Sequence, residues 1–100
     1  MAGSKQVMSA RQMERIAKAL ADPRRYEILQ ALRKKDGQMW CSDVRAFTGI
    51  NPATLSHHMK ELEVSGLVRS DRDGKFVCYA LERHVLTAYL DQIRSDLTAE

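Results

Sequence analysis

Residues 51–66 read Asn-Pro-Ala-Thr-Leu-Ser-His-His-Met-Lys-Glu-Leu-Glu-Val-Ser-Gly, and this stretch decides the fold. Asn51 can accept a hydrogen bond from a free N–H of a first helical turn, and Pro52 suits the first helical position. Gly66 can adopt the left-handed conformation that ends a helix. The sequence therefore predicts one helix with a defined beginning and a defined end.

This predicted helix has two different faces. Leu55, Met59 and Leu62 recur at spacings of four and three, which places them on one face directed toward a core. A helix that enters the major groove of DNA needs small residues near its N-terminus and donors that reach base edges and phosphates. We interpret the helix as a DNA recognition helix, with an ordinary amphipathic surface helix as the alternative. The residues of the opposite face are Ala53, Thr54, Ser56, His57, Lys60 and Val64.

The two neighbouring histidines of this helix are expected to differ. His57 lies on the outward face beside Ser56, and we expect it to contact DNA. His58 lies at the edge of the core-facing side, where a histidine is usually packed and hydrogen-bonded.

Length and composition predict one small globular domain covering residues 1–100. The chain has 44% hydrophobic and 29% charged residues, which is typical of soluble proteins. No apolar run approaches the roughly 20 residues of a membrane span, and the first residues lack the apolar segment of a secretory signal. We therefore expect a cytoplasmic protein with no membrane partner, and we expect residues 1–7 to be disordered.

Charge is unevenly distributed along the chain. Residues 1–35 hold nine Lys and Arg against three Asp and Glu, a net charge of +6, whereas residues 81–100 have a net charge of −2. This asymmetry fits a protein that meets a polyanion on one side. Residues 51–80 hold four cations and four anions and are neutral. A net charge of zero is low for a segment that binds DNA. The second interpretation is therefore a winged helix that binds another protein.

Two helices are predicted before residue 36. The first begins near Met8 and presents an apolar stripe that includes Met13 and Leu20. Asp22-Pro23 ends this helix and starts the next one, with Asp22 as the N-cap and Pro23 in the first turn. Ile28, Leu29 and Leu32 form the expected buried stripe of the second helix.

A short strand and a brief helix are predicted next. Met39-Trp40-Cys41 has the composition of a strand, and Ser42 is expected to cap the helix that follows. Val44 and Phe47 are expected to point inward from that helix, which ends at Gly49.

Beyond Gly66 the spacing of apolar residues is no longer helical and becomes typical of strands. Residues 67–70 and 75–81 are rich in strand-forming side chains, and Asp73-Gly74 between them indicates a β-hairpin. The hairpin carries three cations that could contact DNA phosphates: Arg69, Arg72 and Lys75. A last helix is predicted from about Arg83 to Leu97, with apolar residues at spacings of three and four.

The order helix, helix, strand, helix, turn, helix, hairpin, helix is that of a winged helix-turn-helix. The fold class is thus mostly α with a small β-hairpin (α+β). In this fold the hairpin and the helix ends contact phosphates, while a few side chains on the exposed helix face read bases.

At this point the sequence resembles the ArsR/SmtB family of bacterial winged-helix repressors. The resemblance rests on residues 19–29 (Ala-Leu-Ala-Asp-Pro-Arg-Arg-Tyr-Glu-Ile-Leu), on Ser-His-His-Met-Lys-Glu-Leu at 56–62 with Ser-Gly-Leu-Val at 65–68, and on the hairpin at 73–81. It covers the chain from about Met13 to Leu97. The resemblance implies a homodimer joined through the first and last helices, which represses transcription by binding an inverted-repeat operator of double-stranded DNA. It also implies that Ala53, Thr54, Ser56 and His57 face the major groove.

The apolar stripes of the first and last helices support this dimer. Together they would expose more contiguous apolar surface than soluble monomers tolerate, so we expect them to close a two-fold interface. The expected interface residues are Met13, Ile16, Leu20, Leu86, Tyr89, Leu90, Ile93 and Leu97.

The family resemblance raises the question of metal sensing, because members of the family bind metals through either of two ligand motifs. The sequence departs from both motifs. Thiolate sensors of the family carry a cysteine pair near the third helix, whereas this chain has Cys41 alone there. In sensors that bind metal through the last helix, the ligand motif begins with Asp-x-His, and Glu82-Arg83-His84 partly matches this beginning. The later ligand positions are Ser95 and Thr98, which are poor ligands for divalent metals. We therefore expect no metal site and no cofactor, and the sequence does not specify an inducer.

Cys41 and Cys78 are the only cysteines. In winged helices the strands that carry them can lie side by side, so a thiol-responsive repressor is a further alternative. We expect instead that both are reduced and buried as small apolar side chains. The chain contains no nucleophile with its base, no carboxylate pair and no cofactor loop, so we do not expect an enzyme.

Overall fold

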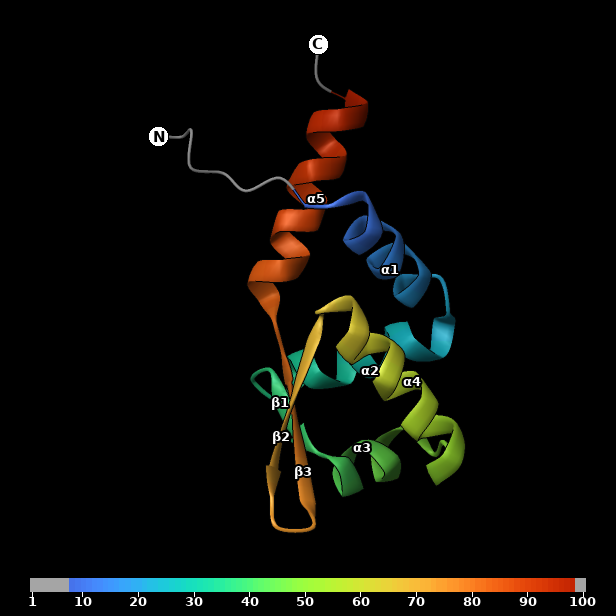
Figure 1. Cartoon of the computed structure of the whole chain (residues 1–100). Helices are drawn as coiled ribbons and strands as arrows, with labels where there is room; N and C mark the ends of the chain where they lie inside the picture. Colours follow the sequence, from blue (N-terminus) through green and yellow to red (C-terminus); the bar gives the residue numbers. More distant parts are fainter. Residues whose placement is uncertain (1–7, 99–100) are drawn as a thin grey trace.

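The computed structural model describes residues 8–98 and confirms a winged helix-turn-helix, with five helices and a small antiparallel sheet (Figure 1). The expectation of disorder for residues 1–7 lies outside the described residues. The elements in chain order are α1 (Ala10–Leu20), α2 (Pro23–Lys34), β1 (Gln38–Trp40), α3 (Cys41–Thr48), α4 (Pro52–Ser65), β2 (Val68–Asp73), β3 (Phe76–Leu81) and α5 (Arg83–Thr98).

Side-chain caps set the beginnings of three helices. The backbone N–H of Gln12 donates to Ser9 Oγ at 3.1 Å, so α1 begins just after Ser9, slightly later than expected. The carboxylate of Asp22 accepts from the N–H of Arg24 at 2.8 Å and starts α2, as predicted. Asn51 Oδ1 accepts from the N–H of Thr54 at 2.9 Å and starts α4.

The core lies between α1, α2, α4 and the inner face of the sheet. It confirms the stripes predicted for α2 and α4, because these side chains are all buried. From α2 these are Ile28, Leu29 and Leu32, and from α4 they are Leu55, Met59 and Leu62.

The sheet has three strands in the order β1-β3-β2, all antiparallel, so the short strand lies beside the second hairpin strand, an arrangement that the winged-helix resemblance allowed. Trp40 lies opposite Cys78, and Asp73 lies opposite Phe76. Directly opposed residues share a face, so Trp40, Phe76 and Cys78 lie on one face, which we call the outer face. The inner face carries Tyr79 and packs on the core.

Four local predictions were wrong. Cys41 is the first residue of α3 rather than a strand residue, and the N-cap is Trp40 rather than Ser42. Phe47 was expected to point inward but is 53% exposed, because α3 is a two-turn helix that buries only Val44. Strand β2 extends to Asp73, beyond the predicted end at residue 70.

Helix α5 projects away from the rest of the molecule, on the end opposite the hairpin tip (Figure 1). Tyr89 is its one buried residue. Within residues 8–98, no helix combines the length and the apolar character needed to cross a membrane.

Candidate DNA-binding surface

Helices α3 and α4 form a helix-turn-helix whose turn is held by defined contacts. Gly49 ends α3 in the left-handed conformation, with φ of 71°, which favours glycine. Thr48 Oγ1 donates to the carbonyl of Val44 at 2.8 Å and accepts from the N–H of Ile50 at 3.3 Å. Since Ile50 is buried, the turn is anchored in the core, and the angle between the two helices is fixed.

The outward face of α4 is free of the core. Ala53, Thr54, Ser56, His57 and Lys60 are all exposed, as the sequence predicted. The first turn of α4 contains no acidic residue. The positive end of the helix dipole is therefore not offset by a carboxylate and can favour a phosphate.

Helix α1 supports α4 from behind. Ile16 and Ala19 of α1 are fully buried, and α1 packs against α4. Gln12 Nε2 donates to the carbonyl of Ser65 at 3.5 Å, near the end of α4. Gly66 then ends α4 with φ of 88°. The recognition helix is thus held at its C-terminal end by the first helix of the chain.

A buried arginine, which we did not predict from the sequence, joins α1, α2 and α4. Arg25 donates from Nε to the carbonyl of Ala19 at 2.9 Å and from Nη2 to the carbonyl of Lys18 at 2.9 Å. Its Nη1 lies 3.3 Å from Nδ1 of His58 and 3.7 Å from Oδ2 of Asp22. The two carbonyls end α1, and the imidazole belongs to α4, so one guanidinium fixes three helices together.

His58 is packed and hydrogen-bonded, as predicted. Because a guanidinium can only donate, Nδ1 of His58 accepts this bond and carries no proton. Burial lowers the pKa of His58, the Asp22 carboxylate works against this by raising it, and the Arg25 guanidinium lowers it further. The imidazole is therefore held neutral, as a structural part of α4.

The hairpin forms the wing. Asp73 and Phe76 close a turn at Gly74 and Lys75, and Gly74 has φ of 64° with open space around it. Arg72 and Lys75 are exposed, and neither forms an ion pair within residues 8–98. Both are therefore able to meet a phosphate.

Arg69 is placed differently from the other two wing cations. Its Nη1 lies 2.7 Å from Oε1 of Glu82, and its Nε lies 3.1 Å from Oδ2 of Asp71. The pKa of Arg69 is raised by the Asp71 hydrogen bond and by both carboxylates. Arg69 is half-exposed and already has two carboxylate partners at the protein surface, which distinguishes it from Arg72 and Lys75.

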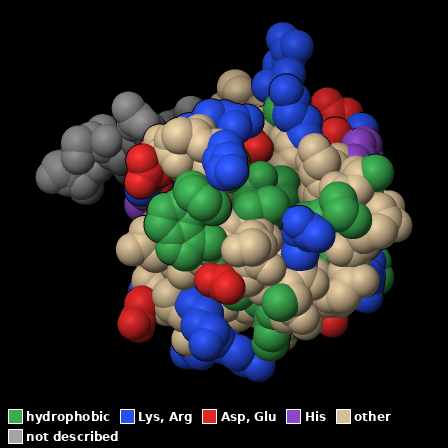
Figure 2. All heavy atoms as spheres, turned by 90° about the horizontal axis from the view of Figure 1, so that it is seen from below, with side chains coloured by type: hydrophobic (Ala, Val, Ile, Leu, Met, Phe, Trp, Pro, Cys, Tyr) green, Lys and Arg blue, Asp and Glu red, His purple; other side chains and the backbone are tan. Residues whose placement is uncertain are grey.

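Part of the acidic charge of residues 51–80 is also occupied. Ser70 Oγ donates to Glu63 Oε1 at 2.6 Å, and Asp71 pairs with Arg69. These contacts fix the positions of Glu63 and Asp71, while the segment remains neutral overall. Figure 2 shows the end of the molecule that bears the wing tip, with hydrophobic side chains in the middle and both basic and acidic side chains around them.

The two cysteine thiols do not face one another. Cys78 Sγ lies 3.9 Å from Oε1 of Gln38, on the outer face of the sheet. Cys41 packs against the core, near the Tyr79 hydroxyl on the inner face. Burial, with smaller contributions from Cys41 and Glu63, raises the pKa of Tyr79 to about 12. A disulfide between the two cysteines would require the backbone to move.

The residues predicted to form a dimer interface fall into two groups. Ile16 is completely buried and Tyr89 nearly so, both inside the protomer, because they pack on α4 and on the core. The prediction that these two lie on an exposed stripe was wrong. Met13, Leu20, Leu86 and Ile93 are half-buried, and Leu90 and Leu97 are exposed.

Leu20, Leu86 and Leu90 line one side of an open apolar groove of about 520 Å³. Tyr26 and Leu29 of α2 line the other side, with Arg33 and Lys34 at its edge. The groove joins α1, α2 and α5 and lies away from the outward face of α4. Among residues 8–98, no three His, Cys, Asp or Glu side chains gather in a way that could hold a metal ion.

Comparison with known proteins places this geometry in a family. Residues 20–71 match the family described as "Helix-turn-helix domain". The chain is 34% identical over 74 residues to the transcriptional repressor SdpR of Bacillus subtilis, covering 74% of this chain and 80% of that protein.

Two solved structures share the fold over nearly the whole chain. The crystal structure of an ArsR family transcriptional regulator has a TM-score of 0.78 at 25% identity, covering 91% of this chain and 92% of that chain. The solution structure of a homodimeric winged helix-turn-helix DNA-binding domain from Mycobacterium bovis has a TM-score of 0.68 at 30% identity, covering 95% and 94%.

Sequence and fold agree on the same assignment. The match to the helix-turn-helix family covers both helices of the motif and most of β2, and SdpR aligns with three quarters of the chain. With the buried support of α4 and the exposed wing, these findings show that the chain belongs to the ArsR/SmtB family of winged-helix transcriptional repressors.

Proposed function

We propose that the protein is a homodimeric repressor that binds an inverted-repeat operator in double-stranded DNA. In this proposal residues 1–100 make up one winged-helix domain that acts in the bacterial cytoplasm and has no catalytic role. The observation that carries the proposal is the outward face of α4, which is exposed along its length while its inner face is fixed in the core.

The proposed DNA contacts follow from exposure and charge. Ser56 and His57 would form hydrogen bonds with base edges in the major groove. The small side chains of Ala53 and Thr54 would let α4 approach the DNA closely. Lys60 on α4 and Arg72 and Lys75 on the wing would contact phosphates. Arg69 is left out, because Asp71 and Glu82 already pair with it.

The proposed dimer uses the exposed part of the apolar stripes. Leu90 is 50% exposed and lies in the groove with Leu20 and Leu86, and Leu97 is exposed further along α5. A projecting helix with this much exposed apolar surface is typical of a subunit interface. The Mycobacterium bovis relative is described as homodimeric, and we propose the same assembly here. Two-fold symmetry would place the two α4 helices in successive major grooves, which requires a roughly palindromic site.

The test is selection of bound sequences from a randomised duplex, followed by a gel shift on the selected site. We expect an inverted repeat to emerge and its affinity to fall steeply with salt. A protein-contact module would select no sequence and would bind duplex DNA weakly at low and moderate salt alike. That result would overturn the proposal.

A further inference from the structure

An exposed aromatic pair lies beside the wing tip and has no role in the contacts proposed so far. The indole of Trp40 and the ring of Phe76 meet edge to face, with centroids 6.3 Å apart and planes at 78°. Phe76 is 60% exposed and Trp40 is 43% exposed. Two large apolar rings kept in water at a functional end of the molecule suggest a surface that is buried in a complex.

The strand register fixes the place of Phe76. It is the first residue of β3, directly opposite Asp73, and only Gly74 and Lys75 lie between them. The ring therefore belongs to the wing tip itself, with the exposed cations Arg72 and Lys75 nearby in sequence. Figure 1 shows that this tip projects at the end of the molecule where α3 and the beginning of α4 also lie.

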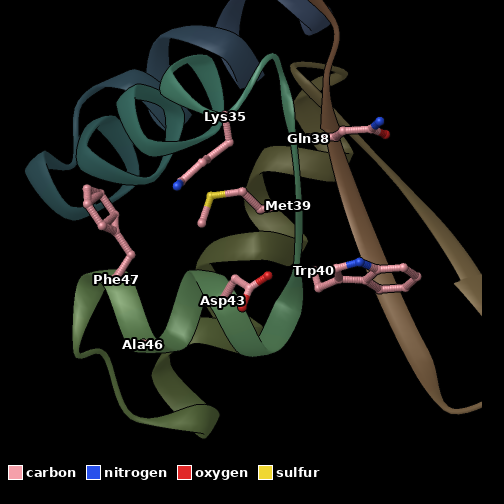
Figure 3. Close-up of a pocket in the computed structure, with 7 residues that line it drawn as sticks. All are labelled: Lys35, Gln38, Met39, Trp40, Asp43, Ala46 and Phe47. Carbon is pink, nitrogen blue, oxygen red and sulfur yellow. The ribbon is translucent and has the colours of Figure 1, made fainter.

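Trp40 braces this ring from the neighbouring part of the sheet. A hollow of about 490 Å³ lies between the end of α2, β1 and α3. Trp40 and Phe47 both line this hollow, and Figure 3 shows the Trp40 indole extending toward β3 while Phe47 lies at the far end of α3. An edge-to-face contact with an indole restricts the rotation of the Phe76 side chain, so less entropy is lost when the ring is buried.

We propose that Phe76 is an apolar DNA contact, which enters the minor groove next to each half-site and wedges against a base step. This inference rests on the proposed function. Apolar side chains such as Phe are used in this way by proteins that bind the minor groove, where they partly unstack a step and bend the duplex. Asp73 lies directly opposite Phe76 and shares its face, so the phosphate contacts at this tip fall to the exposed cations Arg72 and Lys75, and the ring supplies contact that salt does not screen.

The wedge predicts a preference in the DNA flanking the half-sites. Pyrimidine–purine steps unstack easily, while A-tracts are stiff. Sites flanked by a TA or CA step at the wing position should therefore bind more tightly than the same half-sites flanked by an A-tract. This preference would arise without any hydrogen bond to a base.

The experiment compares Phe76→Ala, Phe76→Leu and Trp40→Ala with the parent on the selected duplex. Phe76→Ala should weaken binding by about tenfold without changing the slope of log affinity against log salt. Phe76→Leu should keep most of the affinity, and Trp40→Ala should lose an intermediate amount. Phe47→Ala is the matched control, because it removes an exposed aromatic ring of α3 away from the wing, and it should bind like the parent.

A spectroscopic measurement identifies the wedge directly. With 2-aminopurine placed in turn at each flanking position, the parent should raise its fluorescence at one step, and Phe76→Ala should not. The inference is overturned if Phe76→Ala binds within twofold of the parent, if Phe47→Ala loses as much, or if no flanking position responds. If the parent selects no duplex at all, the proposed function fails, and this inference falls with it.

Discussion

Nη1 of Arg25 and Nδ1 of His58 lie 3.3 Å apart in the interior, joining the start of α2 to the middle of the recognition helix. The same guanidinium is bound to two carbonyls at the end of α1. The position of α4 therefore depends on a polar contact as well as on the apolar core.

Replacing Arg25 should destabilise the fold strongly. Arg25→Met leaves two buried carbonyls and the His58 ring without their donor, so the free energy of unfolding should fall by about 2–4 kcal/mol. Urea unfolding followed by circular dichroism measures the change. The matched control is Arg24→Met, since Arg24 is exposed and pairs only with Glu27 at 3.4 Å. It should change stability by less than about 0.5 kcal/mol.

The same contact should make stability depend on pH. The pKa of His58 is lower in the folded protein than the ordinary value of 6.5, so the unfolded chain binds a proton more readily. The contribution of His58 to the free energy of unfolding is thus fully present above about pH 6.5. It is lost as the pH falls toward the lower pKa of the folded protein. Below that pKa this group causes no further change.

Thermal unfolding at several pH values between 5 and 7.5 measures this loss. His58→Gln should lose less stability over this window than the parent, because a side-chain amide cannot gain the proton. His57→Gln leaves the buried contact intact and should follow the parent. Equal pH dependence in the parent and in His58→Gln would contradict the prediction.

Base contacts and phosphate contacts should be separable by mutation. Ser56→Ala and His57→Ala should each weaken operator binding by about 1–3 kcal/mol and leave binding to random duplex nearly unchanged. Lys75→Ala should weaken binding to all duplexes and reduce the salt slope by about one. Titrations of both duplexes at several salt concentrations test this. Equal losses on operator and random DNA would show that Ser56 and His57 position the protein without reading sequence.

Dimer formation should depend on Leu90. Leu90→Asp places a charge in the groove between α1, α2 and α5, where desolvation is costly, and should yield monomers. Specific affinity should collapse, because each monomer holds one half-site, while weak nonspecific binding remains. Sedimentation at micromolar concentration measures the assembly. The control is Val64→Asp, because Val64 is an exposed apolar residue of α4 outside the groove, and this variant should remain dimeric. A monomeric parent would disprove the proposed dimer.

The cysteines should have little effect on DNA binding. Cys78 lies on the outer face of the sheet, whereas Cys41 begins α3 and packs against the core, so Cys41→Ser and Cys78→Ser should each leave operator affinity close to that of the parent under reducing conditions. Treatment with a mild oxidant and mass spectrometry should show no Cys41–Cys78 disulfide in the native protein. A loss of binding on oxidation that disappears in both single variants would instead establish a thiol switch.

The sequence predicted most of the helices because their signals are local. Asp22-Pro23, Asn51-Pro52 and Gly66 each place a cap or a stop within one turn of the helix end, and the structure confirms all three. The outward positions of Ser56 and His57 followed from the same helical period.

Long-range contacts could not be predicted in this way. Arg25 occurs in a segment with several cations, and nothing local shows that its partners lie at Ala19 and at His58. The pairing of β1 with β3 depends on residues about 40 positions apart, which a hairpin signal cannot reveal. Phe47 was misplaced because helical period gives a direction but not the presence of a neighbour to pack against.

The projection of α5 also links folding to the amount of protein in the cell. A helix of 16 residues is marginal in water by itself, and beyond the buried Tyr89 and half-buried side chains such as Leu86 and Ile93, α5 has little contact with its own protomer. Its outer turns should therefore become ordered only as a second subunit arrives, so that helix content rises with protein concentration. Occupancy of the operator would then rise more steeply than in proportion to expression, which would give the repressor a threshold without any added ligand.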